Sequence, residues 1–172
     1  MIEHFRGTVQ TCAPRVFSAI ASAAIAAAAV SASAPVSASP LSDLQGRWSG
    51  WGSVQMSNGT REQVKCVATY FLKDGGSSVS QNLRCASSSY KIDAAANYVL
   101  KGDQVSGRWE ERTWSAVGSV SGRMTDKGFN LAIQGQTFSA GMAMMTTSCK
   151  QSIQITPQGF GVSRISIGLG KC

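Results

Sequence analysis

Residues able to perform acid–base or metal chemistry are scarce in this chain. Its only histidine is His4, and no Cys-x-x-Cys pair occurs anywhere in the sequence. A Ser-His-Asp or Cys-His catalytic unit, a usual zinc site and a histidine base working near neutral pH all need histidine. The composition therefore predicts that the protein is not an enzyme. It also predicts no bound metal ion, and no residue pattern selects a cofactor.

The two adjacent carboxylates, Glu110 and Glu111, form the only such pair in the chain. Neighbouring residues of a strand point to opposite faces, so this pair cannot flank one glycosidic bond as an acid and a base. Glu111 shares a face with Trp109 and is a candidate to meet a ligand inside a barrel. A structural carboxylate satisfied by protein partners is the alternative.

Aromatic and thioether side chains recur on the more apolar faces of the expected strands. If that face lines an interior, they form a wall suited to a flat or aliphatic ligand. In a small barrel the same side chains can instead fill the core and leave no room. The candidate ligand-binding residues on this reading, with Glu111, are Tyr70, Tyr98, Trp109, Met142 and Met144.

The N-terminal segment is typical of a secretory signal peptide. A weakly basic start precedes an Ala-rich apolar run from Val16 to Val30, and small residues follow up to Pro40. Small residues before position 39 favour cleavage after Ala38, giving a signal peptide over 1–38 and a single domain over 39–172. The segment contains His4 and Cys12, so the predicted mature chain has no histidine and four cysteines. The protein is expected to be exported, either periplasmic or secreted.

From Gly46 onward the sequence has period two, with turn residues at short intervals. The clearest strand is Tyr90 to Leu100, where alternate positions are apolar. Such a pattern predicts an all-β antiparallel meander of about eight to ten strands closed into an up-and-down barrel, with a two-sheet sandwich as the alternative. The other expected strands are Val64 to Leu72, Val105 to Trp114, Phe129 to Ile133, Phe138 to Met144, Ile153 to Ile155 and Ile165 to Leu169.

The even number of cysteines in the predicted mature chain indicates two disulfides. A turn at Gly75-Gly76 places Cys66 opposite Cys85 and keeps apolar residues on one face. The second disulfide then joins Cys149 to Cys172 across a hairpin turning near Phe160. If these two cysteines lie directly opposite each other, Ile153 pairs with Gly168, and the isoleucines of the two strands then point to opposite faces of the sheet. Such a pairing requires either a β-bulge or a sheet that is covered on both faces.

The segment from Leu41 to Trp48 resembles the opening of a lipocalin or another calycin-type barrel. In those families a short turn leads into Gly-x-Trp on the first strand, and the Trp closes the base of the barrel under an Arg from the last strand. Gly46 and Trp48 match that motif, and Arg164 is the candidate for the Arg. The resemblance implies a small barrel more strongly than it implies a ligand.

The predicted mature domain is cationic. Loss of Glu3 and two arginines from the total leaves fourteen basic and eight acidic residues, a net charge of +6. The basic residues stand singly along the chain, which argues against specific binding of nucleic acid. Weak attraction to anionic envelope components is expected instead. No segment of the mature chain is long enough for a transmembrane helix.

The sequence is compatible with three functions. The leading one is a binding protein with a small apolar or amphipathic ligand in, or at the mouth of, its barrel. The second is an envelope factor that binds another protein, such as an inhibitor of a protease or other hydrolase. The third is a structural protein held at the envelope by its positive charge.

Overall fold

The computed structural model describes residues 40–159 and 161–172. The predicted signal segment, with His4 and Cys12, lies outside the described residues, as does Phe160. The elements are α1 (Pro40–Leu44), β1 (Gly46–Met56), β2 (Arg61–Lys73), the 3-10 turn η1 (Asp74–Gly76), β3 (Ser78–Ala86), β4 (Lys91–Lys101), β5 (Gln104–Glu111), β6 (Ala116–Thr125), β7 (Gly128–Gly135), β8 (Ser139–Thr146), β9 (Lys150–Gln158) and β10 (Val162–Gly170).

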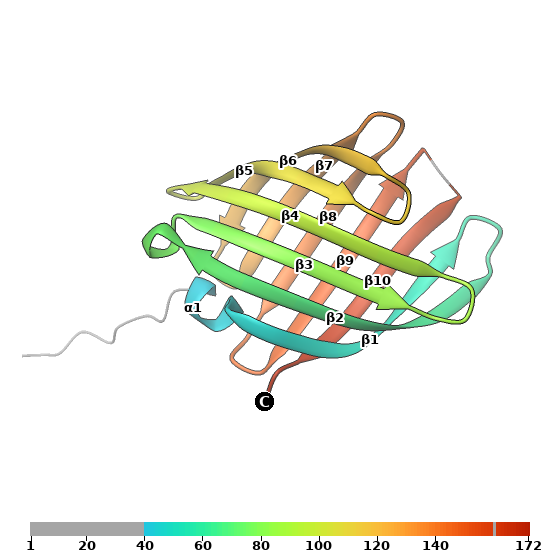
Figure 1. Cartoon of the computed structure of the whole chain (residues 1–172), viewed down its shortest axis with the longest axis horizontal. Coiled ribbons are helices and arrows are strands. Elements are labelled where there is room, and N and C mark those ends of the chain that lie inside the picture. Colours follow the sequence, from blue (N-terminus) through green and yellow to red (C-terminus); the bar gives the residue numbers. More distant parts are fainter. Residues whose placement is uncertain (1–39, 160) are drawn as a thin grey trace, which may run out of the picture. The chain divides into compact units, whose positions relative to one another are not determined.

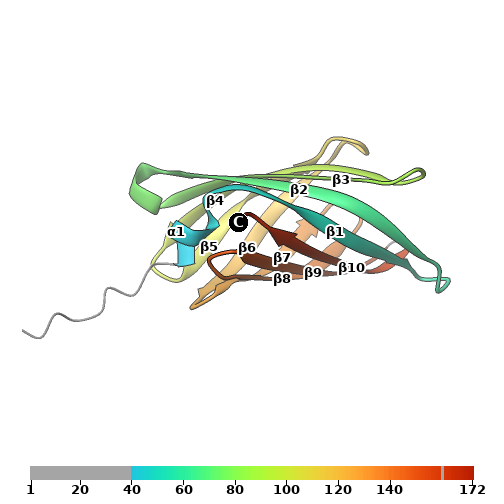
Figure 2. The ribbon, with the colours of Figure 1, turned by 90° about the horizontal axis from the view of Figure 1, so that it is seen from below.

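The ten strands form one closed antiparallel barrel. Each strand pairs with its neighbours in the sequence, and β1 pairs with β10 to close the sheet (Figures 1 and 2). This architecture confirms the predicted up-and-down meander, and the sandwich alternative is wrong. Closure leaves no strand edge exposed, which explains how so many consecutive hairpins remain a single unit. Among the described residues, no helix is both long and apolar enough to cross a bilayer.

The two ends of the barrel differ. One, here called the α1 end, carries α1 and the turns that follow β2, β4, β6 and β8; the other, here called the mouth, carries the turns that follow β1, β3, β5, β7 and β9. The helix contacts β8 as well as leading into β1, so it crosses the α1 end (Figure 1). Leu44 is buried there against the core. The helix therefore covers one opening of the barrel.

The first disulfide and its register match the prediction. Cys66 is bonded to Cys85, and the two strands also pair Ala68 with Leu83. Gly75 and Gly76 both have positive φ in the connecting turn, a conformation that glycine adopts without strain. Both cysteines are buried inside the barrel. Alternation of apolar residues and turn chemistry were thus sufficient to fix this hairpin.

The second disulfide also forms, between Cys149 and Cys172, but the expected strand register is wrong by one residue. Ile153 lies opposite Ile167 and not Gly168. The ladder ends at the pair of Lys150 with Gly170, and the chain then runs two residues further before Cys172 reaches back to Cys149. The register is the one that buries the isoleucines of both strands on the same face, and the disulfide forms between residues that lie beyond the last strand pair.

Trp48 lies buried at the α1 end, but its cationic partner there is not the expected one. The indole is fully buried and donates a hydrogen bond of 2.8 Å from Nε1 to the Leu44 carbonyl. Lys171 places its ammonium 4.7 Å from the ring centroid. Arg164 is exposed and lies opposite Gln55, toward the mouth, so the assignment of Arg164 to this role is wrong.

Position along the strand explains that correction. Arg164 is near the start of β10 and Trp48 near the start of β1, and antiparallel pairing puts these two starts at opposite ends of the barrel. Lys171 follows β10 and is therefore beside Trp48. Its ammonium also donates to the Gln45 carbonyl at 3.3 Å and to the Asp43 carbonyl. The lysine thereby ties the C-terminal residues to the covering helix.

We expect Trp48→Ala to lower the free energy of unfolding by about 3–5 kcal/mol, because it empties a fully buried site. Lys171→Gln should cost about 0.5–2 kcal/mol through loss of the cation–π contact. Arg164→Gln is the matched control and should have no measurable effect. Urea unfolding of the three variants makes the comparison, and an Arg164→Gln cost equal to that of Lys171→Gln would contradict the assignment.

Removal of either disulfide should also weaken the barrel. The bonded cysteines are 19 and 23 residues apart, and such cross-links typically contribute about 2–4 kcal/mol. Thermal melts with and without reductant measure the effect. Equal melting temperatures in the two conditions would show that the cysteines are unpaired in solution.

Candidate functional site

A cavity of about 540 Å³ occupies the part of the barrel interior nearest the mouth. Its size falls within the range of about 300–1,000 Å³ that is usual for small-molecule sites. The wall is formed by side chains of β3 to β10, by Met56 at the end of β1 and by residues of the mouth turns. Among the lining residues are Leu83, Ile92, Ala94, Ala96, Val120, Ile133, Ala140, Ile155, Val162 and Ile165.

The other half of the interior, toward the α1 end, is filled. Its largest fully buried side chains include Trp48, Tyr70 and Met144, and none of these three lines the cavity. The interior formed by the described residues is therefore a filled core toward the α1 end and hollow toward the mouth. The boundary between the halves is the floor of the cavity.

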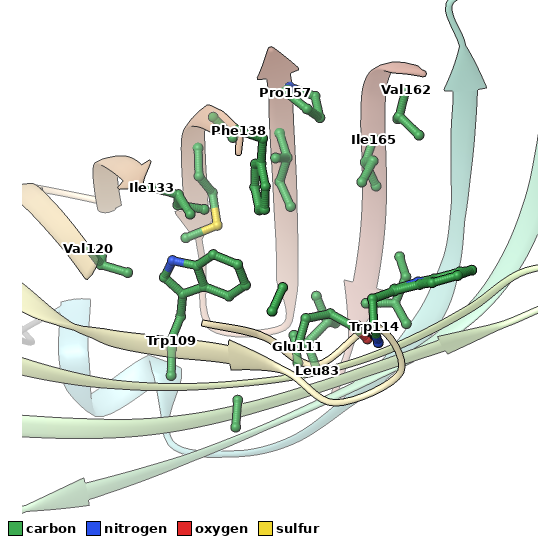
Figure 3. Close-up of a pocket in the computed structure, with 18 of the residues that line it drawn as sticks. Leu83, Trp109, Glu111, Trp114, Val120, Ile133, Phe138, Pro157, Val162 and Ile165 are labelled. Carbon is green, nitrogen blue, oxygen red and sulfur yellow. Dashed lines mark hydrogen bonds between the residues drawn. The ribbon is translucent and has the colours of Figure 1, made fainter. Parts of the chain in front are cut away.

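Trp109 and Phe138 form an aromatic wall on one side of the cavity. Their ring centroids are 5.3 Å apart, and Figure 3 shows both rings projecting into the pocket. Gly118 on β6 lies opposite Trp109, and a Cβ atom there would come within 2.6 Å of the indole Nε1. The glycine thus lets the indole extend over β6 and donate to the Gln134 carbonyl on β7 at 3.2 Å.

Glu111 lies at the mouth and has protein partners for both carboxylate oxygens. Oε1 accepts from the Asp93 backbone N–H at 2.8 Å, and Oε2 accepts from the Trp114 backbone N–H at 2.7 Å. These bonds hold the turn between β5 and β6, where Ser115 has positive φ. Glu111 also lines the cavity, but both of its carboxylate oxygens are hydrogen-bonded to backbone N–H groups at the mouth.

That turn corrects the expected strand from Val105 to Trp114. β5 ends at Glu111, and Trp114 lies in the turn, where the residue is 69% exposed. The carboxylate of Glu111 stabilises the turn by binding the Trp114 N–H, so the alternating pattern stops there. Trp114 therefore belongs to the rim of the cavity, and its position is visible in Figure 3.

Buried polar side chains begin at the cavity floor and continue toward the α1 end. The Tyr98 hydroxyl donates to Gln81 Oε1, and Gln81 Nε2 donates to the Tyr70 hydroxyl at 3.3 Å. Tyr70 donates to Gln151 Oε1 at 2.9 Å, and Gln151 Nε2 donates to Thr146 Oγ1 at 3.1 Å. This series, here called the floor network, crosses the barrel. These hydrogen bonds offset the free-energy cost of burying the polar groups that make them.

Of the six candidate ligand-binding residues, four line the cavity: Tyr98, Trp109, Glu111 and Met142. Tyr70 and Met144 point inward as expected but lie deeper, in the filled half, where the Tyr70 hydroxyl also contacts the Met144 sulfur at 3.3 Å. Period-two alternation predicts which face a residue occupies but not its depth along the barrel axis.

Sequence reasoning missed several lining residues. Phe138 directly precedes β8 and is in step with Ala140 and Met142, so extending the alternation of β8 by one residue could have identified it. Gln81 was missed because it is polar, and only its pairing with Tyr70 and Ala96 brings it to the floor. Tyr90 and Trp114 reach the cavity from turns at the mouth, where no periodicity applies.

The cavity wall is nearly free of ionisable side chains. Of the described residues that line it, Glu111 is the only carboxylic acid, and none is lysine or arginine. In the described ranges 40–159 and 161–172, no three Cys, Asp, Glu or His side chains gather in a manner that could hold a metal ion. The interior is therefore suited to apolar contact and to neutral hydrogen bonding.

Comparison with known proteins supports the fold. No family model and no curated protein matches the sequence. Among solved structures, the chain is similar to the S-type phycobiliprotein lyase CPES from Guillardia theta, with a TM-score of 0.52 and 15% identity. The match covers 76% of this chain and 88% of that one. This similarity and the closed barrel support a calycin-like fold, as the Gly46-x-Trp48 motif indicated.

The same comparison corrects the prediction that the protein is not an enzyme. That prediction rested on the absence of histidine after His4, which excludes particular catalytic designs. A protein of similar fold is described as a lyase, so scarcity of histidine is not sufficient to separate this barrel from enzymes. The two disulfides, by contrast, indicate an oxidising environment for the folded chain.

Burial affects the titration of the two tyrosines in the floor network. Desolvation raises the pKa of Tyr70 well above its ordinary value of 10.0, with a smaller contribution from nearby Tyr98. Desolvation likewise raises the pKa of Tyr98. Both hydroxyls therefore keep their protons in the folded protein across the physiological pH range, and the floor is uncharged.

This shift predicts a loss of stability in alkali. In the unfolded chain these tyrosines release protons near pH 10, whereas the folded chain retains them. The contribution of the two tyrosines to the free energy of unfolding is fully present below about pH 9. It falls as the pH rises from about 10 toward the pKa of the folded state, by up to about 1.4 kcal/mol per pH unit for each tyrosine. Urea unfolding of wild type and Tyr98→Phe across this range tests it. The variant should lose stability less steeply, and parallel curves would contradict the burial argument.

Proposed function

We propose that the barrel binds a small apolar or amphipathic molecule in its cavity. The observation that carries this proposal is a hollow of about 540 Å³ that is lined almost wholly by apolar side chains and bordered by mouth loops. A sequence selected only for stability would fill such a space, because each unfilled volume in a core is destabilising. The filled half toward the α1 end shows that this chain packs side chains densely elsewhere.

The wall favours a ligand with a flat or extended hydrocarbon body. The tilted pair of Trp109 and Phe138 offers aromatic faces and edges, and Met142 adds a thioether that adapts to different shapes. A charged group inside the cavity would have no lysine or arginine from the wall to pair with. Ionised portions of a ligand are therefore expected to remain at the mouth or to be absent.

We further propose that the protein acts outside the cytosol, in the periplasm or after secretion. Two disulfides and the segment resembling a signal peptide over residues 1–38 support this location. Export of the chain can be checked by fractionating cells that produce the full-length sequence.

Binding can be tested with the neutral apolar dye N-phenyl-1-naphthylamine, whose fluorescence rises in an apolar site. Wild type should bind it saturably at one site per barrel. Ala140→Trp should weaken binding by about tenfold or more, equivalent to about 1.4 kcal/mol, because Ala140 is buried on the cavity wall.

Ala143→Trp is the matched control, since Ala143 is exposed on the outer face of the same strand. It should bind the dye as wild type does. If Ala140→Trp does not fold, Ala94→Phe obstructs the cavity from β4 and serves the same purpose. Absence of saturable binding by wild type, or equal binding by the inward and outward variants, would overturn the proposal.

A further inference from the structure

The deepest part of the cavity is formed by two polar residues. Gln81 and Tyr98 are the last cavity-lining side chains on β3 and β4 toward the α1 end. The next inward residues on these strands, Val79 and Leu100, belong to the filled core. Gln81 and Tyr98 are only 5% and 3% exposed, so a ligand that reaches them leaves bulk water behind.

Hydrogen-bonding capacity remains at this floor after the protein contacts are counted. A glutamine amide carries two N–H donors, and Gln81 Nε2 uses one of them toward Tyr70. A tyrosine hydroxyl both donates and accepts, and Tyr98 donates to Gln81 Oε1. Within the described chain, the second Gln81 N–H and the acceptor capacity of the Tyr98 oxygen have no protein partner.

The order of donors and acceptors along the floor network determines which hydrogen-bonding groups of Gln81 and Tyr98 are left for a ligand. The Tyr70 hydroxyl gives its proton to Gln151 Oε1, so toward Gln81 it can only accept. In this arrangement Gln81 turns its Nε2 to Tyr70 and its Oε1 to Tyr98. What remains for a ligand is one donor and one acceptor, side by side and uncharged.

We propose that Gln81 and Tyr98 recognise one neutral polar group, a hydroxyl or a carbonyl oxygen, at the buried end of an otherwise apolar ligand. A carbonyl accepts from Gln81, and a hydroxyl can both accept from Gln81 and donate to Tyr98. The ligand then enters with its polar end first, and its hydrocarbon body lies along the wall of Trp109 and Phe138. This inference rests on the proposed function and adds the ligand class and its orientation.

The absence of charge in the wall supports a neutral group over an ionised one. A carboxylate placed at the floor would find one amide N–H but no cation among the lining residues. Burial of an ion without a partner is far more costly than burial of a hydroxyl that is hydrogen-bonded. Octanol, octane and octanoate therefore form a suitable set of probes, since they share the length of the chain and differ at one end.

The test measures displacement of N-phenyl-1-naphthylamine by each probe from wild type and from Gln81→Leu. The quantity compared is the affinity for octanol relative to that for octane. We expect this ratio to fall by about fivefold to tenfold in Gln81→Leu, as loss of one net hydrogen bond implies. Octanoate should bind wild type more weakly than octanol does. Tyr98→Phe should lower the same ratio and replaces Gln81→Leu if that variant does not fold.

Two controls separate recognition from structural support. Tyr70→Phe breaks the floor network one step behind the cavity and should leave the ratio within about twofold of wild type. Gln134→Leu changes an exposed glutamine on β7 and should have no effect. A ratio unchanged in Gln81→Leu, or lowered equally by Tyr70→Phe, would overturn this inference. If wild type binds no dye at all, the proposed function itself fails, which is a distinct result.

Discussion

Closure of the sheet between β1 and β10 is the constraint on which the rest of the structure depends. Once the last strand pairs with the first, all ten inward faces share a single enclosed space. Every inward residue must then pack, hydrogen-bond or border a void, because none can reach water through the wall. The division of the interior into a filled half and a hollow half is the way in which this chain meets that requirement.

The floor network makes the division possible. Five buried polar side chains are hydrogen-bonded across the barrel, at a level where apolar side chains would need no hydrogen-bond partners. Every described buried side-chain nitrogen or oxygen has at least one hydrogen-bond partner. Tyr98 also stacks against Phe129 on the side of the filled core, with ring centroids 6.3 Å apart. The floor network thus packs against the filled core on one side, and on the cavity side it has hydrogen-bonding groups without a protein partner.

Much of this fold could be predicted from local pattern. Alternation identified the inward face of β4, and turn chemistry fixed the hairpin that joins Cys66 to Cys85, since both signals act over a few residues. The prediction did not delimit β6, because Gly118 and Gly122 remove inward side chains that would have marked its period. The register of β9 with β10 was wrong because a disulfide beyond the ladder constrains alignment less strongly than buried isoleucines do.

The candidate site was predictable only in part, for a geometric reason. Sequence periodicity assigned Tyr70 and Tyr98 to one face, yet only Tyr98 reaches the cavity. The difference depends on how far each strand is displaced along the barrel axis relative to its neighbours, which is a property of the whole sheet. The presence of Lys171 beside Trp48, in place of the expected Arg164, has a different cause: β10 runs antiparallel to β1, so its first residues lie at the mouth.

The position of Cys172 at the α1 end has a practical consequence. Pro40 begins the helix that covers the α1 end, and Cys172 is bonded to Cys149 at that same end (Figure 1). A tether added after Cys172 would leave the opposite opening facing solution. A sensor chip or resin coupled in this manner would hold the barrels with their mouths directed toward the flowing phase.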